Sequence, residues 1–364
     1  MATHIFTSII ANYIPKARVL AETLKRHHPE IAFHLFICDA IPAQIGRIKE
    51  PFTSIWTVAD LEIENCEQWL FQRSLTEAST GIKGLALLKL LDLPDCTEVL
   101  YFDPDIVILQ PLEEILQRFT SASILLTPHL TEPETTFQAI IDNEVCALQH
   151  GAFNLGFLGV KNSEEGRRFA NWWAHRLHHF CWDDIPNGLF TDQRWIDLVP
   201  GFFADHAILR QPGYNVCTWN LTHRTVEGSL RSGLRVNGEP VTFYHFSGID
   251  SGAQAEMLNK YGAKMPALYE LRSWYLSECA RLGQKEFAVI PWKYAAFDNG
   301  HPVHRLHRLR YRQRVDLRAA FPNPFATSDH NNSYYHWFEV NDEAKELVPN
   351  GRKWEGLRSL TAFR

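Results

Sequence analysis

The first hundred residues alternate between continuous apolar runs and segments with helical spacing. In chain order these are a strand at 4–10, a helix at 13–30, strands at 31–39 and 54–61, a helix from about 77 to Pro94, and a strand at 98–102. In the first helix, apolar side chains recur three and four positions apart. Strands that alternate with helices form βαβ units, so we expect a parallel sheet at the centre of an α/β fold.

The second half of the chain is less regular. It contains a strand and polar loop at 121–130, a strand, turn and helix at 150–177, an irregular aromatic segment at 198–221, and a strand ending at His245. After about residue 251 the pattern becomes helical, with no internal repeat. We therefore expect a catalytic domain over 1–250, whose acceptor half begins at about 150, and a helical or irregular extension over 251–364.

Two carboxylates, Asp103 and Asp105, follow the apolar strand in "EVLYFDPDIVILQPL". Ligands of parallel sheets bind at the carboxyl ends of the strands, where these two acids fall. A buried carboxylate is costly unless it is paired or bound to a metal. Carboxylate oxygens suit Mg²⁺ or Mn²⁺, so we predict a metal site, with a solvated turn as the alternative.

Four stretches, in the right order, resemble GT-A glycosyltransferases, particularly family eight and its bacterial relatives. "LYFDPDIVI" resembles the family's D-x-D strand, and "GAFNLGFLGV" its Asn-x-Gly segment. "FTDQRW" resembles its Asp-Gln element, and "FYHFSG" the late histidine that supplies a third metal ligand. The resemblance covers about residues 3–250. It implies a GT-A fold and transfer of a sugar from a nucleoside diphosphate, with UDP as the expected nucleotide.

The resemblance also assigns roles to individual residues. It implies that Asp103, Asp105 and His245 bind the cation and that Lys83 holds the diphosphate or the first acid. Asn154 would bond sugar hydroxyls, while Asp192 and Gln193 would lie nearest the reacting carbon of a retaining enzyme. Each has a structural alternative: a core histidine, a turn asparagine, an aspartate that caps a helix. For Lys83 the competitor is Lys89, which we place on the exposed face of the helix.

The nucleotide should lie against the end of the first strand and the turn after His245. The residues that would contact it are Thr7, Ser8, Asn12, Tyr13, Ser247 and Gly248. Here the sequence departs from family eight, whose members usually carry acidic residues in the first turn. The Lys-Pro-Trp that often follows the late histidine is also missing from "HFSGIDSGAQ".

Charge and cysteine content narrow the class of protein. A formal net charge of −6 argues against a nucleic-acid binder. Seven cysteines without a C-x-x-C pair argue against a disulfide framework or a zinc ribbon. No leader precedes the first strand, and no apolar run approaches the roughly 20 residues of a membrane span. We expect a cytoplasmic enzyme.

The arginine-rich stretch 301–318 is the exception to the acidic balance. A charge run of this kind is most often a solvated face. The functional alternative is contact with anionic lipid or a lipid diphosphate, which would make the protein peripheral on the inner face of the membrane. The acceptor, a saccharide or a lipid-linked group, is not identified by the sequence, and neither is the oligomeric state.

Two other functions remain open from the residues alone. A phosphatase of the haloacid dehalogenase class also uses D-x-D after a strand, with the first Asp as nucleophile. Its later acid pair could only be Asp183 and Asp184. A non-catalytic carbohydrate-binding protein would explain the 12% aromatic content without requiring the acids.

Overall fold

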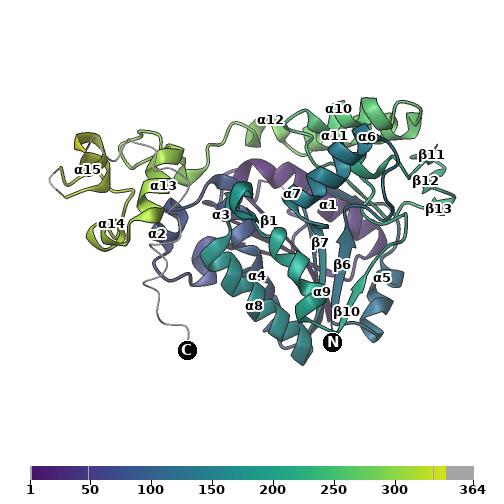
Figure 1. The fold of residues 1–364 in the computed structure, drawn as a ribbon, viewed down its shortest axis with the longest axis horizontal. Coiled ribbons are helices and arrows are strands. Elements are labelled where there is room, and N and C mark those ends of the chain that lie inside the picture. The colour runs from purple at the N-terminus through teal and green to yellow at the C-terminus, as the bar shows by residue number, and fades with distance from the viewer. Residues whose placement is uncertain (1, 48, 331, 342–364) are drawn as a thin grey trace.

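The computed structural model describes residues 2–47, 49–330 and 332–341, and a mixed seven-stranded sheet lies at its centre (Figure 1). The strands follow the order β10-β6-β7-β4-β1-β2-β3. Their bounds are β1 Ala2–Ile9, β2 Ala32–Ile37, β3 Ser54–Thr57, β4 Cys96–Phe102, β6 Ile124–Pro128, β7 Phe153–Lys161 and β10 His206–Ile208. The predicted α/β class is confirmed.

A parallel sheet was expected from the sequence, but the observed sheet is mixed. Strand β7 runs antiparallel to both of its neighbours, β4 and β6. The cause is the connection from β6 to β7, which does not cross the face of the sheet to the opposite ends of the strands. The His129 amide, just after β6, donates to the Ala152 carbonyl, just before β7, at 2.9 Å, so the connection leaves and returns at the same end of the strands. A strand that begins at the end of the sheet where the preceding strand finished runs antiparallel to that strand.

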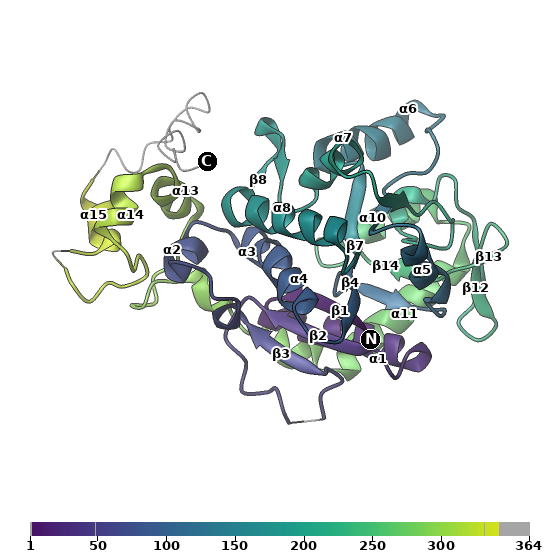
Figure 2. The ribbon, with the colours of Figure 1, turned by 90° about the horizontal axis from the view of Figure 1, so that it is seen from below.

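Helices cover both faces of the sheet. The α1 helix (Ile14–His27) lies on one face, and α4 (Lys83–Leu91) and α8 (Glu164–Phe180) lie on the other (Figure 2). Along β1, Ile5 and Phe6 enter different apolar cores, as the alternation of a strand requires. Gly84 lets α4 and α8 approach closely, since a Cβ there would lie 2.5 Å from the Ala174 Cα.

The predicted helix from 77 to Pro94 is two helices. The α3 helix (Leu75–Gly81) ends where α4 begins, and Ile82 joins them in a right-handed helical conformation. Ser74 and Glu77 form a reciprocal capping box at the start of α3. Lys83 is the first residue of α4 and therefore lies at a junction between two helices, not at a free helix terminus.

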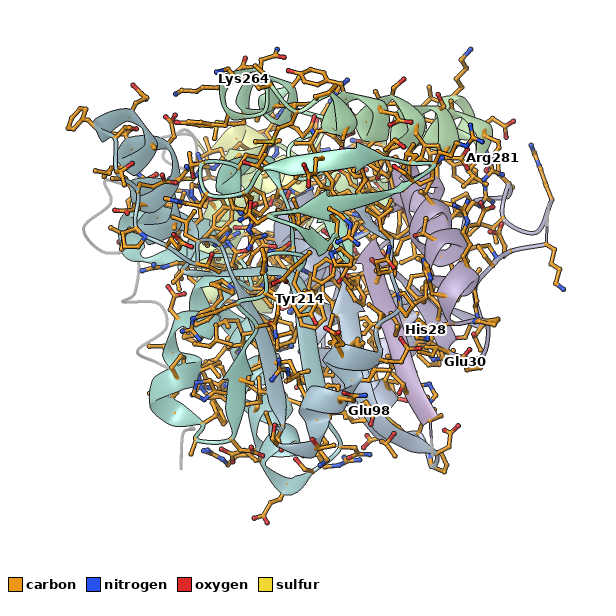
Figure 3. The ribbon with its side chains drawn as sticks, turned by 90° about the vertical axis from the view of Figure 1, so that its right-hand side faces the viewer. His28, Glu30, Glu98, Tyr214, Lys264 and Arg281 are labelled. Atoms are coloured by element: carbon orange, nitrogen blue, oxygen red, sulfur yellow. The ribbon has the colours of Figure 1, made fainter. Side chains whose placement is uncertain are left out.

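A second sheet layer carries the late histidine. Strand β14 (Phe243–His245) pairs antiparallel with β5 (Ile106–Ile108), and His245 lies opposite Ile106. Helices α10 (Ala253–Tyr261) and α11 (Pro266–Arg281) share an apolar core with these two strands. Figure 3 labels Lys264 between these two helices at the top of the view and Glu98 of β4 at the bottom.

The last described helices form a separate cluster around Phe71, the final residue of α2 (Cys66–Phe71) (Figure 1). They are α13 (Arg305–Gln313), α14 (Val315–Ala320) and α15 (Tyr334–Val340). The smaller elements are α5 Glu113–Gln117, α6 Phe137–Ala139, α7 Cys146–His150, α9 Val199–Phe202, α12 Gln284–Phe287, β8 Asp183–Asp184, β9 Leu189–Phe190, β11 Val226–Ser229, β12 Gly233–Val236 and β13 Glu239–Pro240.

Several arginines of the stretch 301–318 face protein rather than solvent. Arg308 and Arg310 are buried. Arg308 donates to the carbonyls of Leu70, Phe71, Arg73 and Tyr294. Contact of this stretch with lipid stays a prediction, and it would fall to exposed members such as Arg305. In the described part of the chain, no helix has the length and apolar character to cross a bilayer.

Candidate active site

Three potential metal ligands converge at the carboxyl end of the central sheet. Asp103 follows β4, Asp105 precedes β5, and His245 ends β14. One ligand atom from each lies within 4.8 Å of the others, and no other such group occurs among the described residues. His245 Nε2 is 3.1 Å from Asp105 Oδ1 and 3.7 Å from Asp103 Oδ2. Two carboxylates and one imidazole are a donor set that fits Mn²⁺ or Mg²⁺.

Asn154 fixes the orientation of the His245 ring from the side opposite the two acids. Its Nδ1 lies 3.2 Å from Asn154 Oδ1, an atom that can only accept a hydrogen bond. The Nδ1 therefore carries the proton, and Nε2 faces the two acids. This is the arrangement of a metal-binding histidine, whose second nitrogen donates to a supporting oxygen. The core-histidine alternative gives no reason for the ring to point at two carboxylates.

Asn154 supports the histidine instead of facing an open sugar site. Its Oδ1 also accepts from the Gly156 amide and from Asn215 Nδ2, both at 3.1 Å. Gly156 provides the space for the ring, since a Cβ there would lie 2.5 Å from His245 Cε1. The space beside Gly156 is thus filled by the imidazole of His245.

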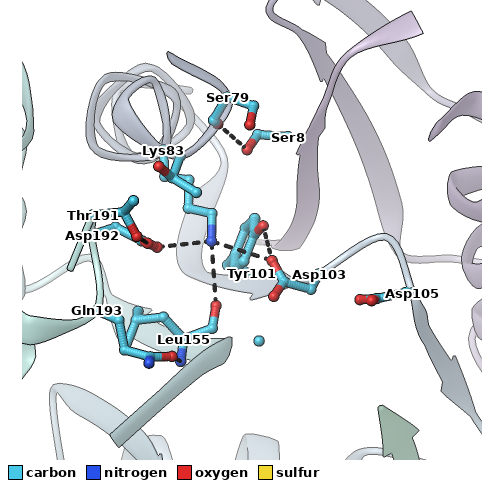
Figure 4. Close-up of polar contacts among 12 residues, drawn as sticks. Ser8, Ser79, Lys83, Tyr101, Asp103, Asp105, Leu155, Thr191, Asp192 and Gln193 are labelled. Carbon is cyan, nitrogen blue, oxygen red and sulfur yellow. Dashed lines mark hydrogen bonds and ion pairs between the residues drawn. The ribbon is translucent and has the colours of Figure 1, made fainter. Parts of the chain in front are cut away.

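Lys83 is the positive partner of the first acid. Its Nζ lies 3.2 Å from Asp103 Oδ1 and 2.8 Å from Asp192 Oδ2, and it donates to the Leu155 carbonyl at 3.4 Å (Figure 4). The ammonium also lies 4.2 Å from the centre of the Tyr101 ring. Burial opposes its charge, but Asp103 and Asp192 together hold the pKa of Lys83 well above its usual value.

Burial acts to raise the pKa of both acids of the D-x-D pair, but their net shifts are opposite. It raises the pKa of Asp103 despite the attraction of Lys83. For Asp105, the nearby His245 outweighs burial and lowers the pKa of the carboxyl. The Tyr101 hydroxyl donates to Asp103 as well. A cation bound between these acids would replace part of the charge that Lys83 and His245 now supply.

Asp192 and Gln193 lie in the segment after β9, which brings Asp192 beside Lys83. The carboxylate of Asp192 pairs with Lys83 and accepts from the Thr191 hydroxyl at 2.9 Å. It caps no helix, so the capping alternative is wrong. Gln193 Oε1 accepts from the Leu155 amide at 3.0 Å. Thr191 has a φ of 43°, a costly conformation for a β-branched residue, and it aims the next side chain at Lys83.

The six residues expected at the nucleotide are divided among several environments. Thr7 is buried, and its hydroxyl has no hydrogen-bond partner in the described part of the chain, while Ser8 donates to the Ser79 carbonyl at 2.7 Å. Tyr13 donates to Asp250 at 2.6 Å. Asn12 has a buried Oδ1 with no partner among the described residues. Ser247 and Gly248 form the turn after β14, where Gly248 has a φ of 77°.

The sequence analysis missed several residues of this site. Lys16 is buried and pairs with Asp250, beyond the turn after His245. Its position in α1 gave no hint, because a lysine between apolar helical positions is normally solvated. Tyr101 and His129 are also part of the network, and neither the apolar strand nor the polar loop in which they lie gave a sign of it. Lys89, the competitor of Lys83, lies 5.5 Å from the Trp56 ring centre instead.

The chain has distant relatives among known proteins. No protein-family model matches this chain. It is 25% identical to the uncharacterized protein YfnF of Bacillus subtilis over 207 residues, which are 56% of this chain and 67% of YfnF. It is also 25% identical to the uncharacterized protein YfnD of the same organism over 255 residues, which are 68% and 78% of the two chains.

Among solved structures, the chain resembles glycosyltransferases at low similarity. For the galactosyltransferase LgtC in complex with donor and acceptor sugar analogues, the TM-score is 0.46 at 15% identity, over 79% of this chain and 97% of that one. For mouse xyloside xylosyltransferase 1 in its apo form, it is 0.40 at 17% identity, over 68% and 97%.

Proposed function

We propose that the protein is a metal-dependent glycosyltransferase that uses a nucleoside-diphosphate sugar, with UDP as the expected nucleotide. The observation that carries this proposal is the group formed by Asp103, Asp105 and His245, with the histidine turned toward the acids by Asn154. These residues would hold Mn²⁺ or Mg²⁺. When bound, such an ion stabilises the charge that develops on a leaving diphosphate. The motif resemblance described above supports the same assignment.

The buried ammonium of Lys83 supplies a second, fixed positive charge. It lies between Asp103 and Asp192, so it can share its hydrogen bonds with a phosphate oxygen that enters the site. A preorganised charge in a water-poor site stabilises a developing anion more than a mobile one does. All of these residues precede 251, within the catalytic unit proposed over 1–250, although α10 and α11 of the extension pack on the strands β5 and β14.

We further propose that transfer retains the configuration of the sugar. Asp192 is paired with Lys83, which suits it to positioning and charge stabilisation at the reacting carbon. Gln193 is held by the Leu155 amide beside it. Proton NMR of the first-formed product tests this: a β-linked product from an α-linked donor would show inversion and make Asp192 the leading base. The acceptor is a saccharide or a lipid-linked group.

The phosphatase alternative finds no support in the geometry. Its later acid pair, Asp183 and Asp184, lies in β8, where Asp184 accepts from Asn187 Nδ2 at 2.8 Å. Neither acid joins Asp103 in the metal-binding group. A carbohydrate-binding protein, in turn, has no need of a buried Lys83 between two acids.

The direct test is a thermal-shift screen of nucleoside diphosphates with and without Mn²⁺. A ligand of the native state raises the melting temperature by mass action. We expect a shift that needs both nucleotide and metal, and we expect Asp105→Ala to remove the metal-dependent part while the protein stays folded. A nucleotide shift of equal size in excess EDTA would contradict the proposal, as would release of free phosphate from a generic ester.

A further inference from the structure

A cavity lies away from the candidate active site. It has a volume of about 310 Å³, at the lower end of the range for small-molecule pockets. Residues of α2, the end of α8, the β8 segment and α13 line it, and none of the metal or lysine cluster does. Its lining includes Trp69, Arg73, Trp182, Leu309, Arg312 and Arg318.

The most unusual group in this lining is Arg73, whose side chain is fully buried. Its guanidinium lies 3.7 Å from the Trp69 ring centre and 4.5 Å from that of Trp182. It donates to the carbonyls of Trp69 and His178. Among the described residues, no carboxylate lies within 4.0 Å of it, and its Nε has no acceptor. Burial lowers the pKa of Arg73 to about 9.

Arg312 extends this positive surface. Its guanidinium lies 3.6 Å from the Trp182 ring centre, and Nη2 pairs with Glu77 Oε2 at 2.9 Å. Burial still lowers the pKa of Arg312, although Glu77 acts in the opposite direction. Three acids line the cavity as well: Glu64 and Asp183 are exposed, and Asp184 is half-buried. Arg73 is therefore desolvated in the interior and Arg312 is half-buried, whereas Glu64 and Asp183 are solvated and screened.

We propose that this cavity binds the oxyanion group of a small molecule, a phosphate or a carboxylate, through the guanidinium groups of Arg73 and Arg312. A buried cation with an unused donor is destabilising unless an acceptor meets it. Guanidinium groups held over indole rings are preorganised to bind planar or tetrahedral oxyanions. The volume leaves room for a molecule larger than inorganic phosphate, such as a phosphorylated or carboxylated sugar.

The cavity and the candidate active site are joined by one hairpin. The carbonyl of Trp182 accepts from the Thr191 amide at 2.9 Å, and Thr191 is bonded to Asp192. The amide of Asp183 donates to Glu77 at 2.9 Å, the same carboxylate that binds Arg312. A ligand in the cavity would thus contact the segment that positions Asp192, although the two sites share no side chain.

Calorimetric titrations at neutral pH without divalent cations test the proposal. The probes are inorganic phosphate, a hexose 6-phosphate, a hexuronate and, as a neutral control, the parent hexose. We expect the anions to bind, the hexose not to bind, and Asp105→Ala to leave anion binding unchanged. That last result separates this site from the proposed transferase site. Comparison of the three anions shows whether phosphate alone, or the sugar attached to it, is recognised.

Three variants locate the binding. Arg73→Met removes the buried donor, and Leu309→Trp fills the cavity while it keeps every arginine, so it remains informative if Arg73→Met does not fold. We expect each to weaken anion binding by about tenfold or more. Arg314→Ala is the matched control, because Arg314 pairs with Asp316 outside the cavity lining. Anion binding that Leu309→Trp leaves unchanged would overturn the proposal, as would no anion binding up to about 10 mM.

Discussion

Replacing Gly156 by alanine would drive a methyl group into the late histidine. The new Cβ would lie 2.5 Å from His245 Cε1, 2.6 Å from its Nδ1 and 2.7 Å from Asn154 Oδ1. Carbon atoms in ordinary contact are at least about 3.4 Å apart, so the ring must retreat by about 0.9 Å. Metal sites tolerate changes of only about 0.2 Å in ligand distance. The substitution should therefore weaken the proposed metal site although it replaces none of the ligand residues.

Two quantities follow from this displacement. Overpacking of a buried site costs about 1–3 kcal/mol in the free energy of unfolding. Loss of the support behind a metal ligand weakens metal binding by about 10–100-fold. Urea unfolding measures the first, and a calorimetric Mn²⁺ titration of the folded variant measures the second.

The control is Gly159→Ala on the same strand. Its Cβ would meet Leu100, Leu125 and Phe119 at 3.0 Å and would not approach His245. We expect Gly159→Ala to lose stability but to keep its Mn²⁺ affinity. A folded Gly156→Ala variant with the Mn²⁺ affinity of the parent would refute the reasoning, because the imidazole would then not be confined as the structure shows.

Two further predictions concern charge. Lys83→Ala leaves Asp103 and Asp192 buried without their cation, so it should cost about 3–5 kcal/mol in urea unfolding. It should also weaken binding of a nucleoside diphosphate much more than that of the nucleoside, and equal losses would indicate a packing effect. Burial lowers the pKa of both His34 and His129 to about 4. Since the unfolded chain binds these protons near pH 6.5, stability should fall as the pH drops from about 6.5 to 4; a melting temperature that is constant over that range would refute this.

The sequence predicted those features that depend on local burial and spacing. Continuous apolar runs placed β1, β2 and β4, and the positions of Asp103 and Asp105 followed from the end of one such run. Lys83 was also predicted as a partner of the first acid, and it lies 3.2 Å from Asp103. For the two acids, the cost of burying a charge demanded a partner, whereas the resemblance to GT-A glycosyltransferases pointed to Lys83.

Features that depend on distant partners could not be predicted. The direction of β7 follows from a connection that returns to the same end of the strands, and no local sequence pattern encodes that path. Asn154 was assigned to sugar hydroxyls because nothing in "FNLGF" shows that His245, 91 residues later, takes the adjacent space. The arginines of 301–318 formed a charge run in the sequence, yet Arg312 meets Glu77 across 235 residues. Hydrophobic periodicity reports whether a side chain is buried, not what it meets.

The position of Phe71 at the centre of the C-terminal cluster has a consequence during synthesis on the ribosome. The aromatic rings packed around it belong to Phe297, Tyr311, Phe325 and Tyr334. At about 5–20 residues per second, roughly 13–50 s separate the appearance of Phe71 from that of its last partner. During this interval the nascent chain carries an exposed aromatic side chain that its own N-terminal part cannot cover. We expect stalled chains that end before residue 297 to be held by chaperones or to aggregate, and co-sedimentation of stalled complexes can measure this.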